Sequence, residues 1–76
     1  MVKILFTFAS SRAAIKADNL CKINNLKIKV IATPEDISSE CGMSLEVSDS
    51  EVAEQLASLL IEKNIQYTKY DRSTSI

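Results

Sequence analysis

The segment M-S-L-E-V-S-D-S-E-V-A-E-Q-L-A-S-L-L, residues 43–60, changes its hydrophobic period partway along. Alternate residues over 43–47 are apolar, which is typical of a strand with one buried face. Beyond Ser48 the apolar residues recur three and four positions apart, and Glu51 follows Ser48 at the spacing of a capping box. The segment therefore predicts a short strand followed directly by an amphipathic helix, which Asn64 ends.

The same two patterns occur on either side of this segment. Apolar alternation predicts three further strands, at residues 2–8, 26–32 and 65–70. An alanine-rich helical pattern runs from a cap at Ser10 or Ser11 to about Asn24. The order β-α-β-β-α-β, with right-handed crossovers, favours a ferredoxin-like α/β (α+β) fold. We expect a four-stranded antiparallel sheet in order 4-1-3-2, with both helices on one face.

Length and composition fit one small globular domain. The chain has 76 residues, 46% of them hydrophobic and 25% charged, which is enough for a single core. We expect a domain over residues 1–70 and a polar tail over 71–76. The first apolar run is far shorter than the ~20 residues that span a bilayer, and no signal-peptide pattern is present. We therefore expect a cytoplasmic protein with reduced thiols and no membrane contact.

The charge pattern argues against a nucleic-acid partner. The net charge is −1 and both signs are mixed along the chain, so no broad positive surface is expected. The open face of the predicted sheet also lacks the aromatic residues on which RNA bases stack. Its central positions are Leu5, Thr7, Ser44 and Glu46.

Three connections should meet at one end of this sheet: the turn before the first helix, the turn after the second helix, and residues 33–43. This last loop, T-P-E-D-I-S-S-E-C-G-M, is longer than a hairpin needs, which favours a functional role. Cys41 lies in it beside Gly42, whose backbone freedom would leave the sulfur accessible. We interpret Cys41 as a reactive thiol. The alternative is that it is a small hydrophobe filling a gap at the start of the strand.

Residues around Cys41 are expected to shape the loop or to stabilise a thiolate. Proline restrains the backbone, hydroxyl groups can hydrogen-bond within the loop, and the start of the first helix brings N–H groups and a cation. The supporting residues are Thr33, Pro34, Ser38, Ser39, Gly42, Ser10, Ser11 and Arg12. The carboxylates of Glu35, Asp36 and Glu40 act against a thiolate because they carry like charge.

Cys21 has the opposite context. Its spacing from Ala14 and Ala17 places it on the core-facing stripe of the first helix, where a thiol is inert. The chain has no histidine and no C-x-x-C pair, so we predict no bound metal. Gly42 is its only glycine, so it has no glycine-rich cradle for nucleotide phosphates.

Two stretches resemble a known family, the selenium/sulfur carrier-like proteins, long classed as a domain of unknown function. V-I-A-T-P-E-D-I-S-S-E-C-G-M-S-L, residues 30–45, is similar to the family's signature, and F-A-S-S-R-A-A-I-K-A-D-N-L, residues 8–20, to its cap and first helix. The matching loop positions are Thr33, Pro34, Ile37, Ser38, Ser39, Cys41 and Gly42. Many relatives carry arginine after the proline, where this chain has Glu35.

The resemblance implies a carrier protein rather than an enzyme. Cys41 would accept a sulfur or selenium atom from a donor protein, hold it as a persulfide or selenosulfide, and pass it to an acceptor protein without a cofactor. Two alternatives stay open. One is a noncatalytic protein-interaction or ligand-sensing module, with edge strands that form a homodimer. The other is a redox-sensing thiol, whose oxidation is reversible.

Overall fold

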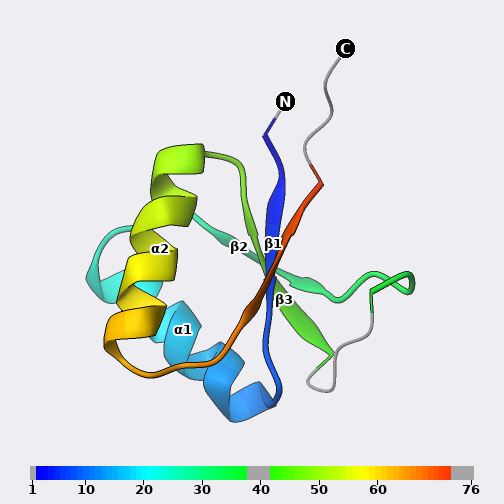
Figure 1. The fold of residues 1–76 in the computed structure, drawn as a ribbon, viewed down its shortest axis with the longest axis horizontal. Coiled ribbons are helices and arrows are strands. Elements are labelled where there is room, and N and C mark those ends of the chain that lie inside the picture. The colour runs from blue at the N-terminus through cyan, green and yellow to red at the C-terminus, as the bar shows by residue number, and fades with distance from the viewer. Residues whose placement is uncertain (1, 38–41, 73–76) are drawn as a thin grey trace.

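A computed structural model describes residues 2–37 and 42–72 of the chain. Its elements follow the predicted order βαββαβ. They are β1 (Ile4–Thr7), α1 (Ser11–Ile23), β2 (Lys29–Ala32), β3 (Met43–Val47), α2 (Ser50–Glu62) and β4 (Thr68–Asp71). Both helices lie on the same side of the sheet, as predicted (Figure 1).

The sheet has the strand order β2-β3-β1-β4, which is the predicted order 4-1-3-2 read from the other edge. Every neighbouring pair is antiparallel. Thr7, the last residue of β1, lies opposite both Ser44 of β3 and Thr68 of β4, while Ala32 of β2 lies opposite Met43. The end of β1, the end of β2, the start of β3 and the start of β4 are therefore at one end of the sheet.

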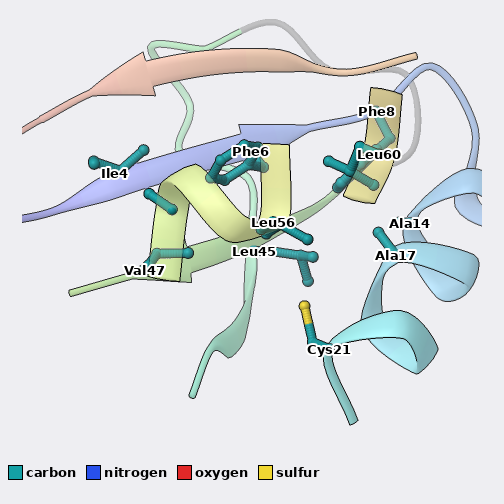
Figure 2. Packing of buried hydrophobic residues seen from close by; sticks show 11 residues of the cluster. Ile4, Phe6, Phe8, Ala14, Ala17, Cys21, Leu45, Val47, Leu56 and Leu60 are labelled. Carbon is teal, nitrogen blue, oxygen red and sulfur yellow. The ribbon is translucent and has the colours of Figure 1, made fainter. Parts of the chain in front are cut away.

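The main core lies between the sheet and the two helices (Figure 2). Its buried members come from both central strands and both helices: Ile4, Phe6, Phe8, Ala14, Ala17, Cys21, Leu45, Val47, Ala53, Leu56 and Leu60. The ring of Tyr67 packs against that of Phe6 with centroids 5.3 Å apart. Small alanines on both helices let the helix backbones approach the sheet, so large side chains from β1 and β3 fill the space between them.

Short polar side chains set where the helices begin. Ser10 caps α1, because its Oγ accepts a hydrogen bond from the N–H of Ala13 at 3.2 Å. The predicted capping box on Ser48 is wrong by one position. Asp49 is the cap of α2, and its carboxylate accepts from the N–H of Glu51 at 2.8 Å. Aspartate caps helices as well as serine does, so two adjacent residues competed for the role.

The chain reverses after each helix at an asparagine in the left-handed conformation, as the sequence predicted. Asn25 has φ 55° and Asn64 has φ 58°. The strands that follow begin later than predicted, at Lys29 and Thr68, because the residues between each turn and its strand pack against the core without pairing. These intervening residues are Leu26, Ile28, Ile65 and Tyr67.

The centre of the other sheet face is covered as well. Leu5, Thr7 and Ser44 alternate with core residues and so face away from the helices, yet they are only 1%, 4% and 0% exposed. Residues 33–37 lie on this side of the sheet (Figure 1). Ile37 is 8% exposed and does not belong to the helix-side core. The loop after β2 therefore adds a partial third layer to the fold.

Removing the apolar side chain of this layer should destabilise the protein. We expect Ile37→Ala to lower the free energy of unfolding by about 2 kcal/mol, since it leaves a cavity on the buried face. The matched control is Ile61→Ala on α2, which removes the same atoms from a side chain that is 67% exposed and should change stability by less than about 0.5 kcal/mol. Urea unfolding followed by circular dichroism measures both. Equal effects would mean that the loop does not pack on the sheet.

Candidate functional site

The loop that carries Cys41 is anchored at its base. Cys41, Ser38 and Ser39 themselves lie outside the described residues, as does Glu40. The N–H of Thr33 donates to the carbonyl of Gly42 at 3.1 Å, which continues the β2–β3 pairing beyond the strands. The structure thus fixes the residues on both sides of the predicted site.

A buried hydrogen bond reinforces this base. The hydroxyl groups of Thr33 and Ser44 lie 2.8 Å apart, and Ser44 is fully buried. The bond satisfies a polar group that would otherwise be costly to bury. The sequence suggested a supporting role for Thr33 but assigned none to Ser44, because a serine at an outward strand position gives no signal of burial.

Gly42 has a conformation that other residues rarely adopt. Its φ is +70°, and a Cβ built on it would meet nothing within 4 Å. The backbone angle, rather than lack of space, therefore favours glycine here. Continuing the β1–β3 register by two positions places Gly42 opposite Ala9, directly before the cap of α1. The residue after Cys41 is thus level with the start of α1, as the sequence-based topology predicted.

The first part of the loop forms a tight turn. The N–H of Ile37 donates to the carbonyl of Pro34 at 3.0 Å, so the turn carries Glu35 and Asp36 at its exposed corner. Together with the burial of Ile37, this turn holds residues 33–37 against the sheet. Pro34 thus accepts the hydrogen bond that closes this turn.

An ion pair ties the turn to the opposite edge of the sheet. Asp36 follows the edge strand β2 and Arg72 follows β4 at the other edge, yet Oδ2 of Asp36 lies 3.0 Å from Nη1 of Arg72. The N–H of Arg72 also donates to the carbonyl of Lys3 at 2.7 Å. The polar composition of residues 71–76 predicted a tail and did not indicate this contact. Because the side chains of Arg72 and Asp36 are 38% and 65% exposed, the pair contributes little to the stability of the fold.

The residues predicted to act at the start of α1 differ in whether their groups are already hydrogen-bonded. The hydroxyl of Ser10 is already bonded to the N–H of Ala13, and the N–H of Ala14 donates to the carbonyl of Ser10 at 3.2 Å. Ser11 is the first residue of the helix and is exposed, as is Arg12. The capping bond therefore already uses the N–H of Ala13, and Arg12 is the exposed cation at this end of the helix.

The other cysteine is part of the core. Cys21 is a free thiol, 1% exposed, and points from α1 into the buried cluster (Figure 2). Desolvation raises the pKa of Cys21 from its ordinary 9.0 to about 11, and the nearby Asp18 carboxylate adds to the rise. Cys21 therefore stays protonated at neutral pH, and its predicted place on the core stripe is confirmed.

This shift makes the stability of the protein depend on alkaline pH. Between pH 9.0 and about 11 the folded chain keeps the Cys21 proton that the unfolded chain has lost, so the free energy of unfolding falls as pH rises. The contribution is fully present well below pH 9.0, and about 2 kcal/mol of it is lost between pH 9 and 11. In Cys21→Ala the fall between pH 9 and 11 should be smaller by that amount, measured by urea unfolding at each pH. Parallel curves for the two proteins would contradict the assignment.

Two kinds of feature are absent from the described part of the chain. No group of three or more His, Cys, Asp or Glu side chains within residues 2–37 and 42–72 could hold a metal ion. Among the same residues, neither helix is long and apolar enough to cross a membrane. Within these residues, the features with possible chemical roles are the base of the β2–β3 loop, the start of α1 and the buried thiol of Cys21.

A comparison with protein families adds to this geometry. A sequence model of one family, described as "putative Se/S carrier protein-like", matches residues 3–71. The match spans both helices, all four strands and the loop that carries Cys41. No curated protein and no solved structure matches the chain.

Proposed function

Because the chain belongs to the family of putative Se/S carrier protein-like proteins, we propose that Cys41 is the thiol on which it carries a sulfur or selenium atom. The family name points to carriage of a chalcogen but names no residue. A covalent carrier needs a thiol that donor and acceptor can reach. The chain has two cysteines, so the proposal reduces to a choice between them.

The burial of Cys21 is the observation that carries this choice. Its side chain is 1% exposed, and its pKa of about 11 leaves almost no thiolate at neutral pH. The thiolate is the nucleophile in thiol exchange, so Cys21 is unsuited to accept an atom from another molecule. Cys41 is the remaining thiol. It belongs to the β2–β3 loop, which starts at the same end of the sheet as the β1–α1 and α2–β4 connections.

The chemistry requires a donor that already holds sulfur in the sulfane state. The Cys41 thiolate attacks the outer sulfur of a persulfide R–S–SH, a new S–S bond forms on Cys41, and R–S⁻ leaves. The reaction exchanges one S–S bond for another and needs no external oxidant. A donor R–S–SeH would load selenium as a selenosulfide by the same step. Release reverses the roles, because an acceptor thiolate attacks the outer atom and Cys41 leaves as the thiolate.

The anchored loop base supports this role. Thr33 and Gly42 are held by a backbone bond, and Thr33 is held again by Ser44, so the strand ends on both sides of the site are rigidly paired. The turn of residues 34–37 is bound to the sheet by Ile37 and by the Asp36–Arg72 pair. A thiol presented from a fixed base can meet successive partners in one orientation, which lowers the entropy cost of each encounter.

Intact-mass spectrometry tests the assignment. Incubation with a low-molecular-weight persulfide should add the mass of one sulfur atom to the wild type, and a selenium analogue should add that of one selenium atom. Cys21→Ser should load as the wild type does, whereas Cys41→Ser should not load. Reducing agent should return each loaded protein to its original mass, because the added atom is held in an exchangeable bond.

Other outcomes would sink the proposal. Loading of Cys41→Ser, or loss of loading in Cys21→Ser with its fold intact by circular dichroism, would move the chemistry to Cys21. A wild type that takes up no chalcogen from either donor would favour the noncatalytic interaction module. Addition of oxygen alone would favour the redox-sensing thiol.

A further inference from the structure

Two adjoining hollows lie between α1 and the turn that joins α2 to β4. One has a volume of about 310 Å³ and the other of about 300 Å³. They share Lys16 and Ile65 in their lining, so the two hollows adjoin, and together we call them the basic trough. Its principal lining side chains are Arg12, Lys16, Leu20, Ile23, Lys63 and Ile65.

The trough concentrates positive charge on a chain whose net charge is −1. Arg12, Lys16 and Lys63 line it, and no aspartate or glutamate does. Within the described residues, none of these three cations takes part in an ion pair. Unpaired cations along one hollow attract a negatively charged partner and steer its approach.

Apolar side chains also line the trough. Ile23 is 76% exposed, although it is a large hydrophobic residue at the end of α1, and Leu20 and Ile65 beside it are only partly buried. Burying such side chains gives affinity, whereas the surrounding cations give orientation. The occupant that fits is therefore a protein segment that presents both carboxylates and an apolar side chain.

The position of the trough relates it to the loop of Cys41. Its lining includes Ala9 and Ser10, at the turn from β1 into α1. Continuing the β1–β3 register two positions beyond Thr7 and Ser44 brings Gly42, the residue after Cys41, level with Ala9. One end of a partner segment lying in the trough would thus reach the end of the sheet at which the Cys41 loop starts.

A second copy of the chain fits the trough poorly. The chain does have an acidic groove, where Glu51 and Glu54 of α2 lie near Asn24 and Leu26. That groove is itself a hollow, of about 640 Å³. Two hollows that face each other would leave their apolar lining residues without a packing partner. Good packing requires a protruding segment instead.

We propose that the basic trough is a docking site for an acidic segment, carrying an apolar side chain, of the protein that donates or accepts the chalcogen. The inference rests on the proposed function for the identity of the partner, and on the charge and shape of the trough for the binding itself. Docking beside the loop raises the local concentration of the partner's reacting group.

A synthetic peptide of glutamate and leucine residues serves as the probe. Titrated into ¹⁵N-labelled Cys41→Ser protein, it should shift the amide signals of residues 9–23 and 63–66, and binding should weaken as salt rises. A peptide with glutamine in place of glutamate, and one with serine in place of leucine, should each bind at least about tenfold more weakly. Because neither the peptide nor the solution supplies a chalcogen, this experiment fails or succeeds independently of chalcogen loading.

Charge reversal locates the interaction. Lys16→Glu with Lys63→Glu should weaken peptide binding at least about tenfold. Lys27→Glu with Lys69→Glu changes the net charge equally at exposed lysines outside the trough and should have little effect. Ile23→Ser should weaken binding several-fold, while Ile61→Ser, at a side chain 67% exposed on α2, should not. If the charge-reversed double variant unfolds, Lys16→Ala with Lys63→Ala tests the same two side chains by removing their charges instead of reversing them.

Several results would overturn the docking site. Equal losses in both pairs of lysine variants would reduce the effect to net charge. Shifts that map outside the trough, or equal binding of the neutral peptide, would remove the charge argument. Trough signals that move with protein concentration alone would assign the surface to a second copy. Tighter binding of a single-stranded oligonucleotide at these residues would assign it to nucleic acid.

Discussion

The position of β1 between β3 and β4 is the constraint on which the rest of the structure depends. β1 pairs antiparallel with both neighbours, and Thr7 aligns with Ser44 on one side and Thr68 on the other. This register gathers the β1–α1, β2–β3 and α2–β4 connections at one end of the sheet. It also encloses β1 on both faces, between the helix-side core and the layer that carries Ile37. A slip of one residue would turn Phe6 away from the helices and destroy both layers.

Local patterns were sufficient to predict the fold because each element is signalled by its own residues. Alternation indicated the strands, spacing indicated the helices, and Asn25 and Asn64 occupy the left-handed turns that asparagine tolerates. Boundaries were less predictable. Ser48 and Asp49 are both good caps, and only the folded turn decides between them.

The features that the sequence did not reveal are contacts between distant segments. Alternation placed Leu5 on an outward face, and it is buried because the β2–β3 loop folds over that side of the sheet. The ion pair between Asp36 and Arg72 joins residues at opposite edges, so no local pattern could signal it. The surroundings of the loop show the same division. Chain order indicated which connections meet, whereas the bonds of Thr33 to Gly42 and Ser44 depend on tertiary structure.

A carrier must release the bound sulfur atom as well as accept it. Release is productive only when the acceptor attacks the outer of the two sulfur atoms of the persulfide. Protein loaded at Cys41 with ³⁵S can be mixed with one equivalent of a low-molecular-weight thiol that serves as acceptor, and the first products trapped at once by alkylation. Attack on the outer sulfur gives labelled acceptor persulfide and returns the free protein thiol. Attack on the inner sulfur gives a mixed disulfide on Cys41 and labelled sulfide. The account predicts labelled acceptor persulfide and unmodified protein in equal amounts, and a mixed disulfide on the protein as the main product would contradict it.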